Sequence, residues 1–149
     1  MMTRINNGIS IQQANWVTDQ HQLTAVRTVV FIQEQKVAAE LEMDGNDLHC
    51  QHVKAVNEKG EIIGTARLLP NHYIGRMCVL KSHRNMGIGG KMLCYFIDYA
   101  RTNNFQSLML NSQLTARSFY QKYGFVADSD VFIEADIEHI HMTLSIANC

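Results

Sequence analysis

The spacing of apolar residues along this chain predicts three helices. In the first, apolar residues recur at helical intervals, and the helix should start at a cap formed by Thr18 or Asp19 and reach about Gln35. A longer apolar stripe marks a second helix over residues 91–101. Aromatic residues form one face of a short third helix over residues 116–123.

Strands are predicted where apolar residues alternate with polar ones or form short runs between turn residues. Pro70, the only proline, ends one such run, and the polar residues 57–60 form a hairpin turn between two others. The expected strands and extended segments are residues 9–11, 53–56, 62–69, 73–80, 107–110, 125–126, 131–133 and 138–146. Helices and strands interleave and strands finish the chain, which predicts one α/β domain over residues 1–149 with a mixed sheet.

Composition argues against several classes of protein. A net charge of -1 without a basic run gives no sign of nucleic-acid binding. No apolar stretch approaches the ~18 residues of a membrane span, and residues 1–8 lack the apolar core of a signal peptide. We therefore expect a cytoplasmic protein with no nucleic-acid or membrane partner, whose cysteines are free buried thiols rather than disulfides. The cysteines are Cys50, Cys78, Cys94 and Cys149.

The most informative segment is the glycine-rich turn between the predicted strand 73–80 and the predicted helix 91–101. Its residues are Arg84, Asn85, Met86, Gly87, Ile88, Gly89 and Gly90. Backbone N–H groups converge at such a turn, the helix dipole adds about half a positive charge, and glycines let an anion approach the backbone. Arg84 can add a charge-assisted hydrogen bond. The turn therefore predicts a site for a phosphorylated ligand.

Other interpretations of these residues have less support. The turn lacks the lysine and hydroxyl residue of a P-loop and the G-x-G-x-x-G spacing of a dinucleotide fold, and taken alone it also fits a purely structural turn. His49, Cys50 and His52 suggest a metal site, but their spacing is tight and a fourth ligand is not evident. We therefore expect no metal.

Two motifs and the asparagine between them extend the pattern. The turn carries R-x-x-G-x-G from residue 84, Asn111 ends the next predicted strand, and A-x-x-F-Y-x-x-x-G-F starts at residue 116. In order and spacing these motifs resemble the two signatures of the GNAT family of acyl-CoA-dependent N-acyltransferases. The resemblance covers residues 9–144 and is nearest to a branch of small bacterial enzymes of undefined substrate. That branch often has Gly-Ile-Pro-His at residues 136–139, where this chain has Asp136 and Glu138 in place of the glycine and the proline.

The resemblance implies a mixed, mostly antiparallel sheet of six to seven strands flanked by about four helices. The fourth and fifth strands, residues 73–80 and 107–110, would splay apart to admit the cosubstrate acetyl-CoA. Its pantetheine arm would pair with the backbone of Met77, Cys78 and Val79 as an added strand does. The pyrophosphate would lie on the amides of residues 84–90. The remaining expected cofactor contacts are Asn111, Ala116 and Tyr120.

The implied reaction is direct attack of a neutral amine on the thioester, with a strand amide near residues 78–79 as donor to the oxyanion. Tyr120 would protonate the leaving thiolate, since a phenol stays protonated at neutral pH. An alkyl ammonium must first lose a proton, for which Glu42 and His139 are the expected acceptors. Other candidate bases are Glu34, Asp44 and Glu134. Cys78 fits a small buried strand residue better than a nucleophile.

Two other functions fit the same residues. A CoA-binding sensor or regulatory module would keep the cofactor site without transferring the acyl group, and an interaction protein would use the glycine turn only as structure. The acceptor, a small-molecule or peptide amine, is not specified by the sequence. An acetyl donor follows from its frequency in the family. The family's dimers leave a homodimer as an alternative to a monomer.

Overall fold

A nine-stranded sheet forms the centre of the computed structural model, which describes residues 2–4 and 8–146. The strands are β1 (Met2–Arg4), β2 (Ser10–Ala14), β3 (Gln51–Val56), β4 (Ile62–Leu68), β5 (Tyr73–Val79), β6 (Ser107–Gln113), β7 (Val126–Ala127), β8 (Phe132–Glu134) and β9 (Ile137–Ser145). Their order is β1-β2-β3-β4-β5-β6-β9-β7, with β8 paired to the start of β9. Only β5 and β6 are parallel neighbours within these residues. The predicted mixed sheet is confirmed. It has more than the predicted six to seven strands, because it includes the short strands β1, β7 and β8.

The helices and helical turns of the described residues are α1 (Trp16–Arg27), a π-helical continuation η1 (Thr28–Glu34), α2 (Ala39–Glu42), η2 (Asp47–His49), η3 (Lys81–His83), α3 (Ile88–Thr102), η4 (Leu114–Ala116) and α4 (Arg117–Gln121). The predicted cap of the first helix is wrong. Asn15 caps it, with Oδ1 accepting from the amides of Val17 at 2.9 Å and Thr18 at 3.2 Å. Asp19 instead accepts from the Asn15 amide at 3.0 Å.

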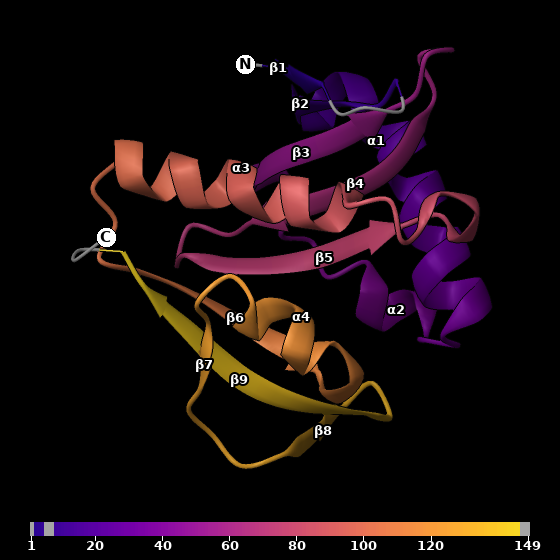
Figure 1. Ribbon diagram of the computed structural model, residues 1–149. Helices are drawn as coiled ribbons and strands as arrows, with labels where there is room; N and C mark the ends of the chain where they lie inside the picture. The colour runs from indigo at the N-terminus through magenta and orange to yellow at the C-terminus, as the bar shows by residue number, and fades with distance from the viewer. Residues whose placement is uncertain (1, 5–7, 147–149) are drawn as a thin grey trace.

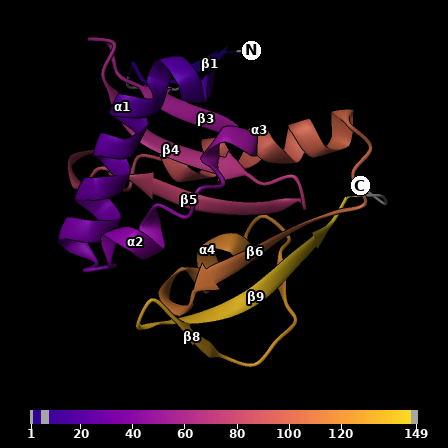
Figure 2. The ribbon, with the colours of Figure 1, turned by 180° about the vertical axis from the view of Figure 1, so that it is seen from behind.

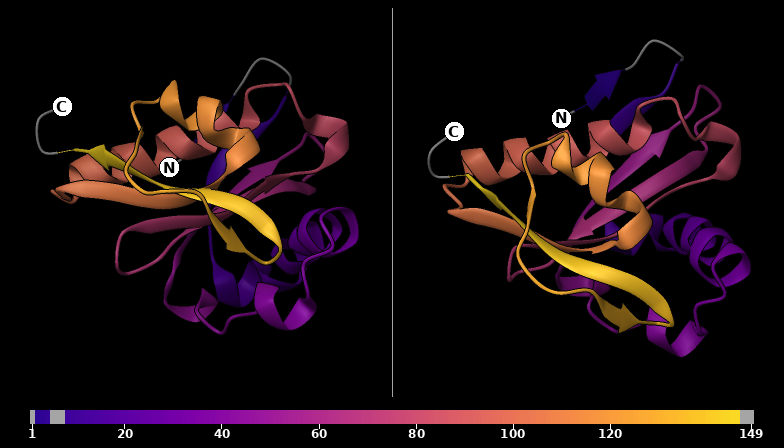
Figure 3. Two further views of the ribbon diagram at one scale, coloured as in Figure 1. Left: turned by 90° about the horizontal axis from the view of Figure 1, so that it is seen from below. Right: turned by 60° about the horizontal axis from the view of Figure 1, so that its bottom comes forward.

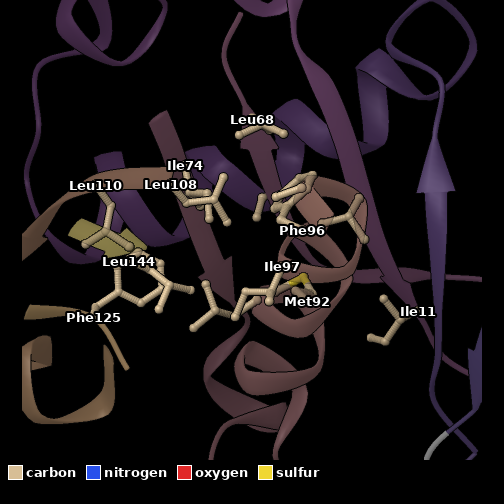
Figure 4. Packing of buried hydrophobic residues seen from close by; sticks show 14 of the residues in the cluster. Ile11, Leu68, Ile74, Met92, Phe96, Ile97, Leu108, Leu110, Phe125 and Leu144 are labelled. Carbon is tan, nitrogen blue, oxygen red and sulfur yellow. The ribbon is translucent and has the colours of Figure 1, made fainter. Parts of the chain in front are cut away.

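The helices cover both faces of the sheet. Figure 1 shows α3 and α4 on one face, and Figure 2 shows α1 and α2 on the other. The apolar stripe of α3 packs on the sheet, where Met92 and Phe96 are fully buried near Leu68, Ile74 and Leu108, as Figure 4 shows. A second, smaller cluster lies under α1. Among the described helices, none combines the length and apolar composition needed to cross a membrane.

The sheet opens between β5 and β6. These strands pair only at Tyr73 with Met109 and at Ile74 with Leu110, and then diverge (Figure 1). A β-bulge accompanies the divergence, because the register between β4 and β5 shifts and Arg76 takes φ 50°. The predicted splay between the fourth and fifth strands is therefore confirmed. Beyond residue 74, the edge of β5 that faces β6 has no strand partner in the described sheet.

Candidate active site

A cavity of about 660 Å³ lies where β5 and β6 separate. Its walls come from the π-helical segment, α2, β4, β5, β6, η4, α4 and the β8–β9 hairpin. The predicted site residues that line it are Met77, Asn111, Ala116, Tyr120, Glu42 and His139, together with the candidate bases Asp44 and Glu134. Cys78, Val79 and the glycine-rich turn are not part of its lining. The fold thus gathers Tyr120 and the two expected bases at one cavity, and leaves Cys78, Val79 and the predicted pyrophosphate turn outside its lining.

Tyr120 reaches the cavity from α4. Its hydroxyl donates a weak hydrogen bond to Met77 Sδ at 3.9 Å, and its ring packs edge-on against Phe119 and Phe125. Burial raises the pKa of Tyr120 to about 12, so the phenol is protonated at neutral pH. It can therefore donate a proton, and it stands beside the strand whose edge is open.

The glycine-rich turn presents backbone amides at the start of α3. Gly87 is the N-cap residue with φ 79°, and Asn85 also has a left-handed backbone with φ 63°. Such residues point successive N–H groups to one side of a turn. The cap supplies no side-chain hydrogen bond to the first helical amides, which belong to Ile88, Gly89 and Gly90. With the helix dipole, these donors form the arrangement that anions bind.

Two residues of this turn have roles that the sequence did not suggest. The Arg84 guanidinium donates to both carboxylate oxygens of Glu34 at 2.9 Å and to the Val79 carbonyl at 2.9 Å, so it links the turn to the π-helical segment. A Cβ at Gly90 would lie 2.0 Å from Tyr123 Oη. This glycine therefore allows Tyr123, which follows α4, to pack against the start of α3, and Figure 3 shows the two helices on the same side of the sheet.

The predicted base Glu42 belongs to a network of charged side chains. Its six members are Arg27, Arg67, Arg76, Glu42, Asp44 and Asp47. Glu42 is 2% exposed and accepts a hydrogen bond from Arg27 Nε. Asp47 Oδ1 accepts from Arg27 at 2.6 Å and from Arg67 at 2.9 Å. The Glu42 carboxylate is thus already engaged as the hydrogen-bond acceptor of a buried guanidinium.

The second predicted base, His139, is buried at the cavity wall with 8% exposure. Its Nδ1 lies 2.7 Å from the Ile137 carbonyl oxygen, and because a carbonyl only accepts, Nδ1 carries the hydrogen. Nε2 of the neutral ring then holds a lone pair, and it lies 3.8 Å from Glu134 Oε2. The hairpin that places His139 turns through Ala135 and Asp136, both with positive φ, and it forms with Asp136 and Glu138 where the family pattern has glycine and proline.

The described cysteines are free thiols as predicted, but only one of them, Cys78, is buried. Cys78 is buried, and burial raises its pKa to about 12, which leaves no nucleophilic thiolate near neutral pH. Cys50 and Cys94 are free but half-buried, and Cys149 lies outside the described residues.

Of the residues that suggested a metal site, His52 is engaged elsewhere, because its Nε2 lies 2.8 Å from the Asp47 carbonyl oxygen. In the part of the chain that the structure describes, no group of three His, Cys, Asp or Glu side chains is arranged to hold a metal ion.

Sequence reasoning missed several polar residues of the cavity, among them Gln35, Asn71, Tyr73 and Gln113. Gln113 of β6 donates to Gln35 at 2.8 Å and so joins β6 to the helix across the cavity. Tyr73, at the start of β5, contacts His141 of β9. The alternation of His139 and His141 along one strand is visible in the sequence, but Tyr73, which contacts His141, is 68 residues away. Nothing in the local pattern identifies such contacts.

Comparison with known proteins identifies the family. Residues 17–146 match the family model of the acetyltransferase (GNAT) domain, and the chain belongs to this family. It is 35% identical over 121 residues to the uncharacterized N-acetyltransferase YjcF of Bacillus subtilis (strain 168), covering 78% of this chain and 86% of that protein.

Solved structures agree with this assignment. An acyl-CoA N-acyltransferase from Pseudomonas aeruginosa superposes with a TM-score of 0.79 at 28% identity, covering 92% of this chain and 98% of that one. A GNAT family acetyltransferase from Elizabethkingia anophelis with acetyl-CoA bound shares the fold with a TM-score of 0.68 at 23% identity, covering 94% and 99%. Membership of the family supports acyl transfer from an acyl-CoA to an amine.

Proposed function

We propose that this protein transfers an acetyl group from acetyl-CoA to a primary amine within a ternary complex. One observation carries the proposal: the protonated Tyr120 hydroxyl stands beside Met77 where β5 loses its partner strand. A thioester held along that edge would have a proton donor at its sulfur. The acetyl-CoA bound to the related enzyme from Elizabethkingia anophelis supports this choice of donor.

Binding of acetyl-CoA would use two regions of the fold. The pantetheine amides would pair with the open backbone of Met77, Cys78 and Val79, with Asn111 and Ala116 on the opposite wall. The pyrophosphate would accept hydrogen bonds from the amides of residues 84–90. Because the Arg84 guanidinium is held by a carboxylate, we assign the anion contact to its backbone and not to its side chain.

The chemistry needs a proton acceptor, a donor to the oxyanion and a donor to the thiolate. We assign the first to His139, because its Nδ1 hydrogen is bound by a carbonyl and Nε2 remains as the acceptor of the neutral ring, 3.8 Å from Glu134 Oε2, while Glu42 is paired with Arg27. A β5 amide near Cys78 would stabilise the oxyanion, and Tyr120 would protonate the thiolate. The amine attacks the thioester directly, so no covalent enzyme intermediate forms.

Acetyl-CoA should stabilise the folded protein in a thermal-shift experiment. At ~100 times its dissociation constant, it should add ~2.7 kcal/mol to the free energy of unfolding. Gly87→Ala should shrink this shift, because a left-handed alanine at the anion turn strains the donors that bind the pyrophosphate. Gly60→Ala is the matched control: Gly60 has φ 81°, also with open space around it, in a distant hairpin. No shift in the wild type would contradict the cofactor site and favour a structural turn.

A CoA-binding sensor or regulatory module is the second candidate. It would show the same thermal shift but no transfer. A thiol-release assay with acetyl-CoA and a panel of amines separates the two functions. The panel should span amino sugars, polyamines, small alkylamines, peptide N-termini and lysine side chains, and acceptor-dependent release of CoA supports the transferase.

A further inference from the structure

Beside the residues assigned to catalysis and cofactor binding, Tyr73, His141 and Asp128 form one hydrogen-bonded chain. Tyr73 Oη lies 2.7 Å from His141 Nε2, and His141 Nδ1 bonds to one carboxylate oxygen of Asp128. Tyr73 lines the cavity, while Asp128 is exposed just after β7. The chain of contacts therefore runs from the cavity wall to the protein surface.

Asp128 is held firmly at the outer end of this chain. Its second carboxylate oxygen accepts from the Thr143 hydroxyl at 2.7 Å, and its N–H donates to the His141 carbonyl at 3.0 Å. The hydrogen bonds from His141 and Thr143 hold the pKa of Asp128 below its usual value. Asp128 is thus a carboxylate at neutral pH, with a fixed position against β9.

The Asp128 carboxylate determines which atom donates in each hydrogen bond between Tyr73, His141 and Asp128. A carboxylate only accepts, so His141 Nδ1 carries a hydrogen, and Nε2 of the neutral ring holds a lone pair. The Tyr73 hydroxyl must then donate to Nε2. Its single hydrogen is used there, and only oxygen lone pairs remain for a molecule in the cavity. Tyr73 is consequently a hydrogen-bond acceptor toward the cavity.

His139 presents a second acceptor on the same wall. It lies two residues from His141 in β9, so the two side chains share one face of the strand about 7 Å apart. Its Nδ1 hydrogen is used by a carbonyl, which leaves the Nε2 lone pair for the cavity. Glu134 Oε2, 3.8 Å from Nε2, adds negative charge at the rim.

We propose that Tyr73 is a binding residue for the acceptor, and that its oxygen and His139 Nε2 together receive N–H groups of a primary alkylammonium. The proposal rests on the proposed acetyl transfer and names its acceptor class. An ammonium offers three hydrogens and a neutral primary amine two, whereas an alcohol offers one and a carboxylate none, so two acceptors select primary amines. The negative charge of Glu134 at the rim favours their cationic form. Asp128 is a positioning residue, because it acts through His141.

The test uses hexylamine as acceptor and acetyl-CoA as donor. Tyr73→Phe keeps the ring and removes the oxygen, so the KM for hexylamine should rise about tenfold or more, as expected for a lost hydrogen bond to a charged group. The kcat and the KM for acetyl-CoA should stay within about twofold. Asp128→Ala should also raise the KM for hexylamine, but by a smaller factor than Tyr73→Phe does. Tyr99→Phe makes the same change on α3, away from the cavity lining, and should alter nothing.

A second ligand separates hydrogen bonding from packing. Hexyltrimethylammonium has the same chain and charge but no N–H group, so its inhibition constant should be equal in the wild type and in Tyr73→Phe. An unchanged KM for hexylamine in Tyr73→Phe, or equal weakening of both ligands, would overturn the role of Tyr73. If Tyr73→Phe does not fold, the same two ligands are compared in the surface variant Asp128→Ala, where only hexylamine should bind more weakly than in the wild type. Failure of the wild type to acetylate any amine would instead overturn the proposed function.

Discussion

Replacing Tyr120 with phenylalanine should lower kcat about 100-fold or more, the contribution typical of a general acid, while leaving the affinity for acetyl-CoA nearly intact. The phenylalanine ring keeps the edge-on packing against Phe119 and Phe125. Only the hydroxyl beside Met77 is lost. The leaving thiolate would then have to take its proton from water. Single-turnover kinetics with acetyl-CoA and an amine from the panel measure the effect on the chemical step.

Tyr95→Phe is the control for this variant. Tyr95 lies on α3 outside the cavity lining, so removal of its hydroxyl should leave kcat unchanged. The binding control is the thermal shift by acetyl-CoA, which should be equal in Tyr120→Phe and in the wild type. Wild-type kcat in Tyr120→Phe would remove Tyr120 from the mechanism. A lost thermal shift would show that the hydroxyl serves binding instead.

The sequence predicted the parts of the site that depend on local pattern. The glycine-rich turn lies between a strand and a long helix, and the Tyr120 helix follows the next strand, as the spacing of the motifs indicates. Apolar periodicity marked these elements because each buries one face against the same core. Their convergence at the opening between β5 and β6 then follows from the order of strands in the sheet.

The sequence did not predict how the polar residues pair. The acidic segment 40–49 fits both a solvated loop and an acceptor-binding loop, but in the structure it is the partner of arginines from three other segments. Charge pairs between segments distant in the sequence produce no periodic pattern of residues. Glu42 and His139 were therefore equal candidates for the proton acceptor. Hydrogen bonds distinguish them. Arg27 donates to the Glu42 carboxylate, whereas the Ile137 carbonyl binds Nδ1 of His139 and leaves Nε2 as the acceptor of the neutral ring.

Asp47→Ala should be among the most destabilising single substitutions, by about 3–5 kcal/mol, because it leaves two buried guanidinium groups without their shared partner. Asp47 is 4% exposed and bonds to both Arg27 and Arg67. The remaining carboxylates, Glu42 and Asp44, already pair with these arginines and cannot replace it. Urea denaturation of the variant and the wild type measures the loss of stability.

Asp98→Ala provides the matched control for this stability measurement. Asp98 also pairs with an arginine, Arg101, but its side chain is 76% exposed. An exposed pair contributes little, so this variant should lose less than about 1 kcal/mol. Equal losses in Asp47→Ala and Asp98→Ala would contradict a structural role for the buried network and return the acidic segment to the acceptor site.

The same charged network should make the free energy of unfolding depend on pH in the acidic range. Burial alone would raise the pKa of Asp47, but hydrogen bonds and charge from Arg27 and Arg67 outweigh burial and hold it below its usual value. A lowered folded-state pKa means that the stabilisation is complete above the unfolded pKa of about 3.9 and is lost as pH falls below it. Between about pH 4 and pH 2, the wild type should therefore lose stability more steeply than Asp47→Ala. Parallel curves for the two proteins would show that other carboxylates cause the acid sensitivity, because in the variant the group at residue 47 no longer titrates.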